Sequence, residues 1–216
     1  MKIIKTLLNV SIMKTIKFNI HYFGIKSLFC FYAIIAKGVQ FKSLKGNIVL
    51  KNKKMGAIKI EFPSIGIDND YVTKGTIEIY GQLIINKKVN LSKGSSISIG
   101  EKGCMEIDSL IVNGNTKIVC NKSILIGNNC LISWGGYIMD TDFHHLYYQG
   151  NIINEDENVI IGNNVWICMN CILLKGTHIP NNSVIGAGSI ITKKLEEENA
   201  LYVNNKVIKR NIEWRM

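Results

Sequence analysis

The stretch from Ile161 to Leu195 repeats every six residues, and an aliphatic side chain opens each unit. A helix repeats about every 3.6 residues and a strand every two residues, so this period fits neither element alone. Short extended pieces joined by regular corners would point one aliphatic residue per unit into a common interior, and three pieces would complete one triangular coil. The repeat therefore predicts a parallel β-helix, whose stability comes from stacking coil upon coil.

The residues that open the units are Ile161, Ile167, Leu173, Ile179, Ile185 and Ile191. Four positions further on stand mostly compact residues that can fill the space beside a corner: Val165, Cys171, Thr177, Ser183, Ser189 and Leu195. Since Gly and Asn tolerate positive φ, we expect Gly162, Gly186, Asn163–Asn164 and Asn181–Asn182 at the bends. A run in the same phase precedes the repeat and contains Ile126, Cys130, Ile132 and Ile138. Upstream, alternating apolar residues between Ile77 and Ile111 predict irregular early coils or short strands.

With 216 residues, of which 47% are hydrophobic, the chain can bury a large core as one domain. We expect an all-β fold with a basic and apolar N-terminal segment (1–40), a β-helix domain (41–198) that extrudes a loop (139–159), and a C-terminal tail (199–216). A β-sandwich could use the same alternation of residues. It would not explain an uninterrupted period of six, and the β-helix is therefore favoured.

The charge is distributed unevenly along the chain. The formal net charge is +10, and Glu61 is the first carboxylate. A basic end of this kind would attract anionic lipid or an acidic polysaccharide, although a merely solvated basic face explains it equally well. Nucleic acid is disfavoured because aromatic residues are not interleaved with the lysines. The apolar run Ser27–Ala36 is too short to span a bilayer, so it could dock on a membrane surface or cap the open end of the coil.

The first residues lack the long apolar core and cleavage site of a secretory signal, so we expect a cytoplasmic protein, at the inner face of the membrane if the basic segment contacts lipid. The cysteines agree with this expectation. They show no zinc-finger spacing, and a core role is favoured over a metal or disulfide role for Cys30, Cys104, Cys120, Cys130, Cys168 and Cys171.

The segment from Ile138 to Val159 breaks the six-residue phase and concentrates polar and aromatic residues. Reactive groups are commonly presented on loops that a rigid scaffold holds. His144 and His145 follow the carboxylates Asp140 and Asp142, and an imidazole oriented by a carboxylate can act as a general base on a hydroxyl. The competing interpretation is a surface histidine pair on a mobile loop. His178 would face outward by the phase of the repeat and play a structural role.

These motifs resemble a known family. The hexads, the looped sequence DTDFH ending at His144, the sequence IGNNVWI and the run VIGAGSIITK are similar to those of hexapeptide-repeat acyltransferases, most of all the O-acetyltransferases of bacterial surface and capsular polysaccharides. The resemblance implies a left-handed β-helix, a homotrimer, and acetyl-CoA as co-substrate in a groove between protomers. It implies a sugar or polysaccharide acceptor, no metal and no nucleic-acid partner.

The same resemblance implies roles for individual residues. His144 would be the base, and Asp142 or Asp140 would orient it or bind the acceptor. Acetyl-CoA would be bound by Met169, Ala187 and Thr192 along its pantetheine arm and by Lys206 and Lys209 at its phosphates. Trp134, His145 and Trp166 would border the acceptor. The sequence departs from the family pattern at Cys168, Met169, Lys175 and His145, where glycine, a small residue, proline and proline are usual.

The function expected from the resemblance is acetyl-CoA-dependent O-acetylation of a sugar hydroxyl in bacterial surface polysaccharide synthesis. Three alternatives stay open at this point. They are N-acetylation of an amino sugar, a non-catalytic solenoid that binds glycan, and a zinc hydratase similar to the γ-class carbonic anhydrases. The last would need three histidine ligands on facing coils, whereas the sequence offers adjacent His144 and His145 and a remote His178.

Overall fold

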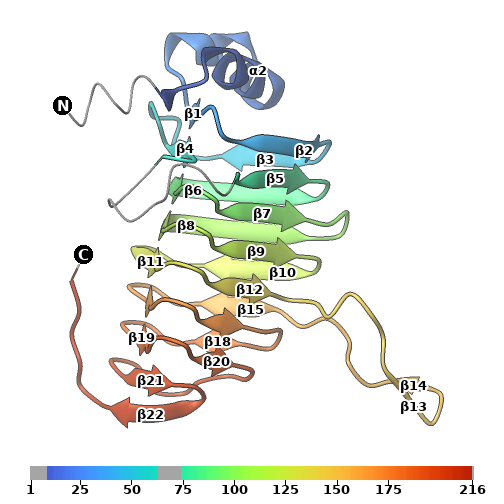
Figure 1. The fold of residues 1–216 in the computed structure, drawn as a ribbon, viewed down its shortest axis with the longest axis vertical. Helices are drawn as coiled ribbons and strands as arrows, with labels where there is room; N and C mark the ends of the chain where they lie inside the picture. Colours follow the sequence, from blue (N-terminus) through green and yellow to red (C-terminus); the bar gives the residue numbers. More distant parts are fainter. Residues whose placement is uncertain (1–8, 63–73, 216) are drawn as a thin grey trace.

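The computed structural model describes residues 9–62 and 74–215. Figure 1 shows an elongated stack of short strands, with a helix across its N-terminal end and one long loop that projects from its side. The tail turns back at the opposite end. The predicted β-helix is thus confirmed.

The strands form three faces, which the chain visits in a fixed order in each coil. The first face contains β1 (Ala33–Ile35), β4 (Ile58–Ile60), the second halves of β6 (Gln82–Leu91) and β8 (Cys104–Val112), β11 (Cys130–Ile132), β16 (Trp166–Ile167), β19 (Val184–Ile185) and β21 (Leu201–Val203). The second face contains β2 (Gln40–Leu44), β5 (Thr76–Ile79), β7 (Ser96–Ile99), β9 (Lys117–Cys120), β12 (Tyr137–Met139), β17 (Ile172–Leu173) and β20 (Ile190–Ile191). The third face contains β3 (Asn47–Leu50), the first halves of β6 and β8, β10 (Ser123–Ile126), β15 (Val159–Ile161) and β18 (His178–Ile179).

The six-residue repeat fills the interior as predicted. The residues that open its units are at most 2% exposed, and they stack in register, as Ile132, Ile167 and Ile185 do on the first face. The compact residues four positions later are buried as well. Their polar groups bond to nearby carbonyls, for example Thr177 Oγ1 to Ile191 O at 3.0 Å and Ser189 Oγ to Gly186 O at 2.5 Å. Burial of these small polar side chains therefore leaves their hydrogen bonds satisfied.

The corner between the third and first faces is built on asparagine. Asn129, Asn164, Asn182 and Asn199 all have φ between 52° and 58°, a conformation that asparagine tolerates better than most residues. Asn129 Nδ2 donates to Asn164 Oδ1 at 2.8 Å, and Asn164 Nδ2 donates to Asn182 Oδ1 at 3.1 Å. The prediction that the asparagine pairs lie at the bends is confirmed at Asn164 and Asn182.

The early coils combine short strands with longer ones. β5 and β7 are four residues long, in agreement with the predicted short strands, whereas β6 and β8 pair in parallel at eight positions across two faces, with a register shift between Ile85 and Lys88. The alternation changes phase at the corner within β8, where Ser109 and Leu110 are both buried. Ile111, the last of the alternating apolar residues in this stretch, is consequently only partly buried.

The N-terminal end of the stack is covered by α2 (Ile12–Phe23) and the 3-10 helix η1 (Ile25–Phe29), and Phe18 packs on the core beneath them. The coil itself begins at β1, within the segment assigned by sequence to the region before the domain. The run Ser27–Ala36 is accordingly divided between η1 and β1, and its Ala33 and Ile35 belong to the core. No helix in residues 9–62 or 74–215 combines the length and apolar character needed to span a bilayer.

Candidate active site

The extruded loop leaves the stack after β12 and returns at β15, close to the predicted bounds. Its tip is a small antiparallel hairpin of β13 (Tyr147–Tyr148) and β14 (Asn151–Ile152), which lies well away from the coils in Figure 1. The hairpin turns at Gln149 and Gly150, both at positive φ, as a tight two-residue turn requires. The loop therefore presents its side chains outward from a rigid support.

Asp140 anchors the point where the loop leaves the coil. Its side chain is fully buried, and its carboxylate accepts backbone N–H groups from Asn121 at 2.7 Å and Lys122 at 2.9 Å. A carboxylate with two such donors fixes the corner of the preceding coil against the start of the loop. Asp140, one of the two acidic residues predicted to partner His144, thus stabilises the scaffold.

Asp142 joins the loop to the scaffold through Lys175, which follows β17 on the next coil. Lys175 Nζ lies 2.6 Å from Asp142 Oδ2 and donates to the carbonyl of Asn154 at 2.6 Å. Asn154 Nδ2 in turn donates to Asp142 Oδ2 and to the carbonyl of His144, both at 2.9 Å. These contacts among Asp142, Asn154 and Lys175, here called the loop clamp, cross-link both strands of the loop at its base and hold the backbone of His144.

The electrostatics of the loop clamp favour a charged Asp142. Its hydrogen bond from Lys175, followed by the one from Asn154, lowers the pKa of Asp142 below its ordinary value. The ammonium group of Lys175 is largely shielded, with 15% of its side chain exposed, whereas 41% of the Asp142 side chain is exposed. Asp142 therefore stays ionised at neutral pH.

His144 stands on a sharply bent piece of backbone. The preceding residue, Phe143, has φ 61°, a conformation that aromatic residues seldom adopt, and its N–H donates to Thr141 Oγ1 at 3.0 Å. The imidazole of His144 is exposed and forms no hydrogen bond to another described residue. His145 is exposed too, and its ring meets that of Tyr147 edge-on at 6.5 Å.

The corner between the first and second faces brings three other predicted site residues together. Trp134, Met169 and Ala187 occupy this corner, here called the Trp134 corner, on three successive coils. Asn170 N donates to Trp134 O at 2.8 Å, and Gly188 N donates to Met169 O at 2.9 Å. Met169 and Ala187 are exposed, so a ligand could lie along this edge.

Thr192 lies at the opposite edge of the second face, where the tail caps the last strand. Its N–H donates to Asn205 Oδ1 at 3.1 Å, and Asn205 Nδ2 donates to Thr192 Oγ1 at 3.0 Å. Asn205 belongs to the turn between β21 and β22 (Lys206–Lys209), whose lysines Lys206 and Lys209 are exposed. The backbone donor of Thr192 is thus engaged by the tail in the isolated chain.

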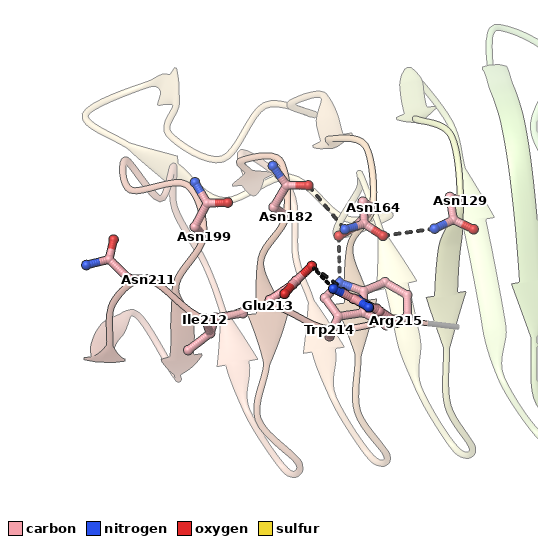
Figure 2. Close-up of a pocket in the computed structure, with 9 residues that line it drawn as sticks. All are labelled: Asn129, Asn164, Asn182, Asn199, Asn211, Ile212, Glu213, Trp214 and Arg215. Carbon is pink, nitrogen blue, oxygen red and sulfur yellow. Dashed lines mark hydrogen bonds and ion pairs between the residues drawn. The ribbon is translucent and has the colours of Figure 1, made fainter.

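Trp166 is packed against the returning tail. Its Nε1 donates to Ser133 Oγ at 3.0 Å, and its ring lies 6.0 Å from that of Trp214. Trp214 and its neighbours in the tail line a cleft of about 690 Å³. Figure 2 shows these residues beside the corner asparagines. The three predicted site residues of the Trp134 corner do not line this cleft.

The predicted residues therefore form two groups. The Trp134 corner precedes strands β12, β17 and β20 of the second face, while Asp140, Lys175 and Thr192 follow these same strands. Extended chain advances about 3.3 Å per residue, so the two edges of this face lie roughly 15 Å apart. Within one protomer, the base of the loop and the Trp134 corner therefore lie apart.

Cys168 is next to the Trp134 corner at a position where glycine is usual. Burial raises the pKa of its thiol to about 11, so the thiol stays protonated at neutral pH and is a poor nucleophile. Within residues 9–62 and 74–215, no three histidine, cysteine or acidic side chains are grouped as a metal site.

Sequence reasoning missed Asn154, Lys175 as a clamp residue, and Asn205. Lys175 did carry a signal, because it stands where the family usually has proline and proline cannot supply an ammonium group. Asn154 carried none, since its role depends on how the two strands of the loop approach each other.

Comparison with known proteins gives consistent results. Residues 158–193 match the family described as bacterial transferase hexapeptide (six repeats). The chain is 35% identical over 114 residues to galactoside O-acetyltransferase of Escherichia coli, covering 51% of this chain and 52% of the relative. It is 41% identical over 66 residues to polysialic acid O-acetyltransferase of Neisseria meningitidis, covering 30% of this chain and 31% of the relative.

Among solved structures, the polysialic acid O-acetyltransferase OatWY aligns with a TM-score of 0.58 and 27% identity, over 85% of this chain and 87% of that chain. The chain spans about half or less of the length of the two curated relatives named above. The three-sided coil is a left-handed parallel β-helix, as the resemblance implied. In its repeat, its coil and these likenesses, the chain is similar to the hexapeptide-repeat acyltransferases.

Proposed function

We propose that the protein is an acetyl-CoA-dependent O-acetyltransferase that acts on a sugar hydroxyl of a bacterial surface polysaccharide, in the cytoplasm. The observation that carries this proposal is the loop clamp, which ties the backbone of His144 to the scaffold while its imidazole stays exposed. Relatives that acetylate galactosides and polysialic acid support the acceptor class.

In the proposed reaction, the acceptor oxygen attacks the thioester carbonyl while His144 removes the hydroxyl proton. A carbon–oxygen bond forms, the carbon–sulfur bond then breaks, and the proton passes from the imidazolium to the departing thiolate of CoA. Since the thioester is already activated, positioning and one proton transfer supply most of what the reaction needs. The loop clamp would keep His144 in place for both transfers.

The proposed cofactor site extends along the exposed Trp134 corner. Met169 and Ala187 would contact the pantetheine arm from this corner. Thr192, at the opposite edge of the second face, would contact it from the neighbouring protomer through its carbonyl, because its N–H is bonded to Asn205. Lys206 and Lys209 are exposed on β22 and would supply positive charge for the phosphates of CoA. Trp134 and His145 are the proposed acceptor contacts, whereas the contacts of Trp166 with Ser133 and Trp214 favour a packing role.

We propose a homotrimer as the active form. The loop and the Trp134 corner lie at opposite edges of the second face, so a site that uses both is completed most simply between neighbouring protomers. In a closed ring each protomer offers its loop to one neighbour and its corner to the other. Three equivalent sites would result.

The function is tested by incubating the purified chain with acetyl-CoA and a panel of nucleotide-linked, lipid-linked and polymeric glycans. Release of free thiol should depend on one class of acceptor, and the product should lose its acetyl group in mild base, as an ester does. A base-stable amide would instead identify an amino sugar as the acceptor. Glycan binding without any thiol release would contradict the transferase assignment.

A further inference from the structure

The helical cap, defined as α2 together with η1, leaves several large apolar side chains in solvent. Phe29 is 92% exposed, Ile12 72%, Ile25 71% and Met13 64%. Single exposed apolar residues are common on soluble proteins, but four within the eighteen residues of this cap are unusual. This concentration calls for a partner surface.

The cap cannot turn these side chains inward, because its inner side is fixed to the first coil. Asn19 Nδ2 donates to Ala33 O at 2.7 Å, and Asn19 Oδ1 accepts from Ala33 N at 3.1 Å. Thr15 Oγ1 likewise accepts from Ile35 N at 3.1 Å. These bonds engage backbone groups at the open edge of β1, and Phe18 is buried against the core on the same side. The opposite side of α2 is therefore held outward.

The charge of this region narrows the choice of partner. The first sixty residues contain twelve lysines and no carboxylate, and Lys17 and Lys26 of the cap are exposed as well. Apolar groups that alternate with lysines are typical of helices that lie in the interface of an anionic membrane. A second copy of the cap would bring like charges together, which disfavours self-association through this face.

We propose that the cap docks on an anionic phospholipid surface through its exposed side chains, which are Ile12, Met13, Lys17, Ile25, Lys26 and Phe29. α2 lies across the end of the stack in Figure 1, so docking would stand the coil away from the lipid. The extruded loop leaves four coils below β1, and coils stack about 4.8 Å apart, which places the base of the loop roughly 20 Å below β1. This inference does not depend on the proposed transferase activity.

Flotation of the full chain with vesicles of phosphatidylcholine, with and without phosphatidylglycerol, tests the proposal. The protein should float with the anionic vesicles and remain in solution with phosphatidylcholine alone. The double variant Ile25→Ser and Phe29→Ser should bind the anionic vesicles at least about tenfold more weakly, because it loses two large apolar contacts. Lys17→Glu should weaken binding roughly fivefold or more, and added salt should remove this difference.

Two controls separate docking from a folding defect and from the proposed function. Ile208, which is 60% exposed on β22, provides the matched variant Ile208→Ser, and it should bind vesicles as the unaltered chain does. Acetyl transfer to a soluble acceptor and the thermal midpoint should be unchanged in the cap variants. Absence of flotation would overturn the proposal, as would self-association that is lost when Ile25 and Phe29 are replaced.

Discussion

The repeat and the extruded loop are neighbours in the chain but are held in different ways. In the repeat, the residues that open the units are fixed by burial and are at most 2% exposed. None of the loop residues 142–158 is buried, and the base of the loop is held by three polar residues, Asp142, Asn154 and Lys175. Apolar burial thus supplies the scaffold, while a few polar contacts place the group proposed to do the chemistry.

The largest effect that would separate the two regions is expected in the loop. Replacing His144 with alanine should lower kcat/KM for acetyl transfer about 10²–10⁴-fold, because the general base is lost. The free energy of unfolding should hardly change, since the imidazole is exposed. Tyr148→Ala, at a loop side chain that is 64% exposed and has no role in the proposed site, is the matched control and should retain most of the activity. A fully active His144→Ala enzyme would rule out this base.

The repeat should show the reverse behaviour. Ile185→Ala removes a fully buried side chain between stacked coils and should lower the free energy of unfolding by about 2–5 kcal/mol. Ile153→Ala in the loop removes a side chain that is 61% exposed, and should change the free energy of unfolding by less than about 0.5 kcal/mol. Urea unfolding followed by circular dichroism measures both. Equal losses would mean that the loop contributes to the core.

This contrast explains how much the sequence could predict. The burial of the residues that open the units, from Ile161 to Ile191, follows from their spacing alone, because only a few folds place every sixth residue in a common interior. The bounds of the loop follow from the break in that period. The loop clamp could not be predicted, since whether Lys175 meets Asp142 depends on the approach of two coils and on the path of the returning strand. The partial exposure of Ile111 could not be predicted either, because the corner in β8 changes the alternation.

An intermediate effect is expected at Lys175, which acts on His144 only through Asp142 and Asn154. Lys175→Ala should lower kcat about 10- to 100-fold, because small displacements of a reacting group are costly, while KM for acetyl-CoA should stay close to that of the unaltered chain. Lys175→Arg keeps a cation and should recover most of the rate. If alanine and arginine behaved alike, charge at this position would not matter.

The smallest effect concerns pH. A carboxylate whose pKa is lowered on folding contributes stability above its unfolded pKa and loses it as pH falls through the folded pKa. The loop clamp should therefore remain closed from neutral pH to about pH 4, the ordinary range of aspartate, and open only below it. Hydrogen exchange of loop peptides, corrected for intrinsic rates, should show this change in the unaltered chain. Asp142→Asn should show faster exchange at neutral pH and no such transition.

The central claim is that one protomer supplies the loop and its neighbour supplies the Trp134 corner. Complementation tests it directly, by coexpressing His144→Ala with Ala187→Trp, in which a bulky side chain blocks the exposed corner. If protomers mix at random, an intact loop meets an intact corner with a chance of one half times one half, and about a quarter of the unaltered activity should return. Mixed trimers with no more activity than either variant alone would contradict a site shared between protomers.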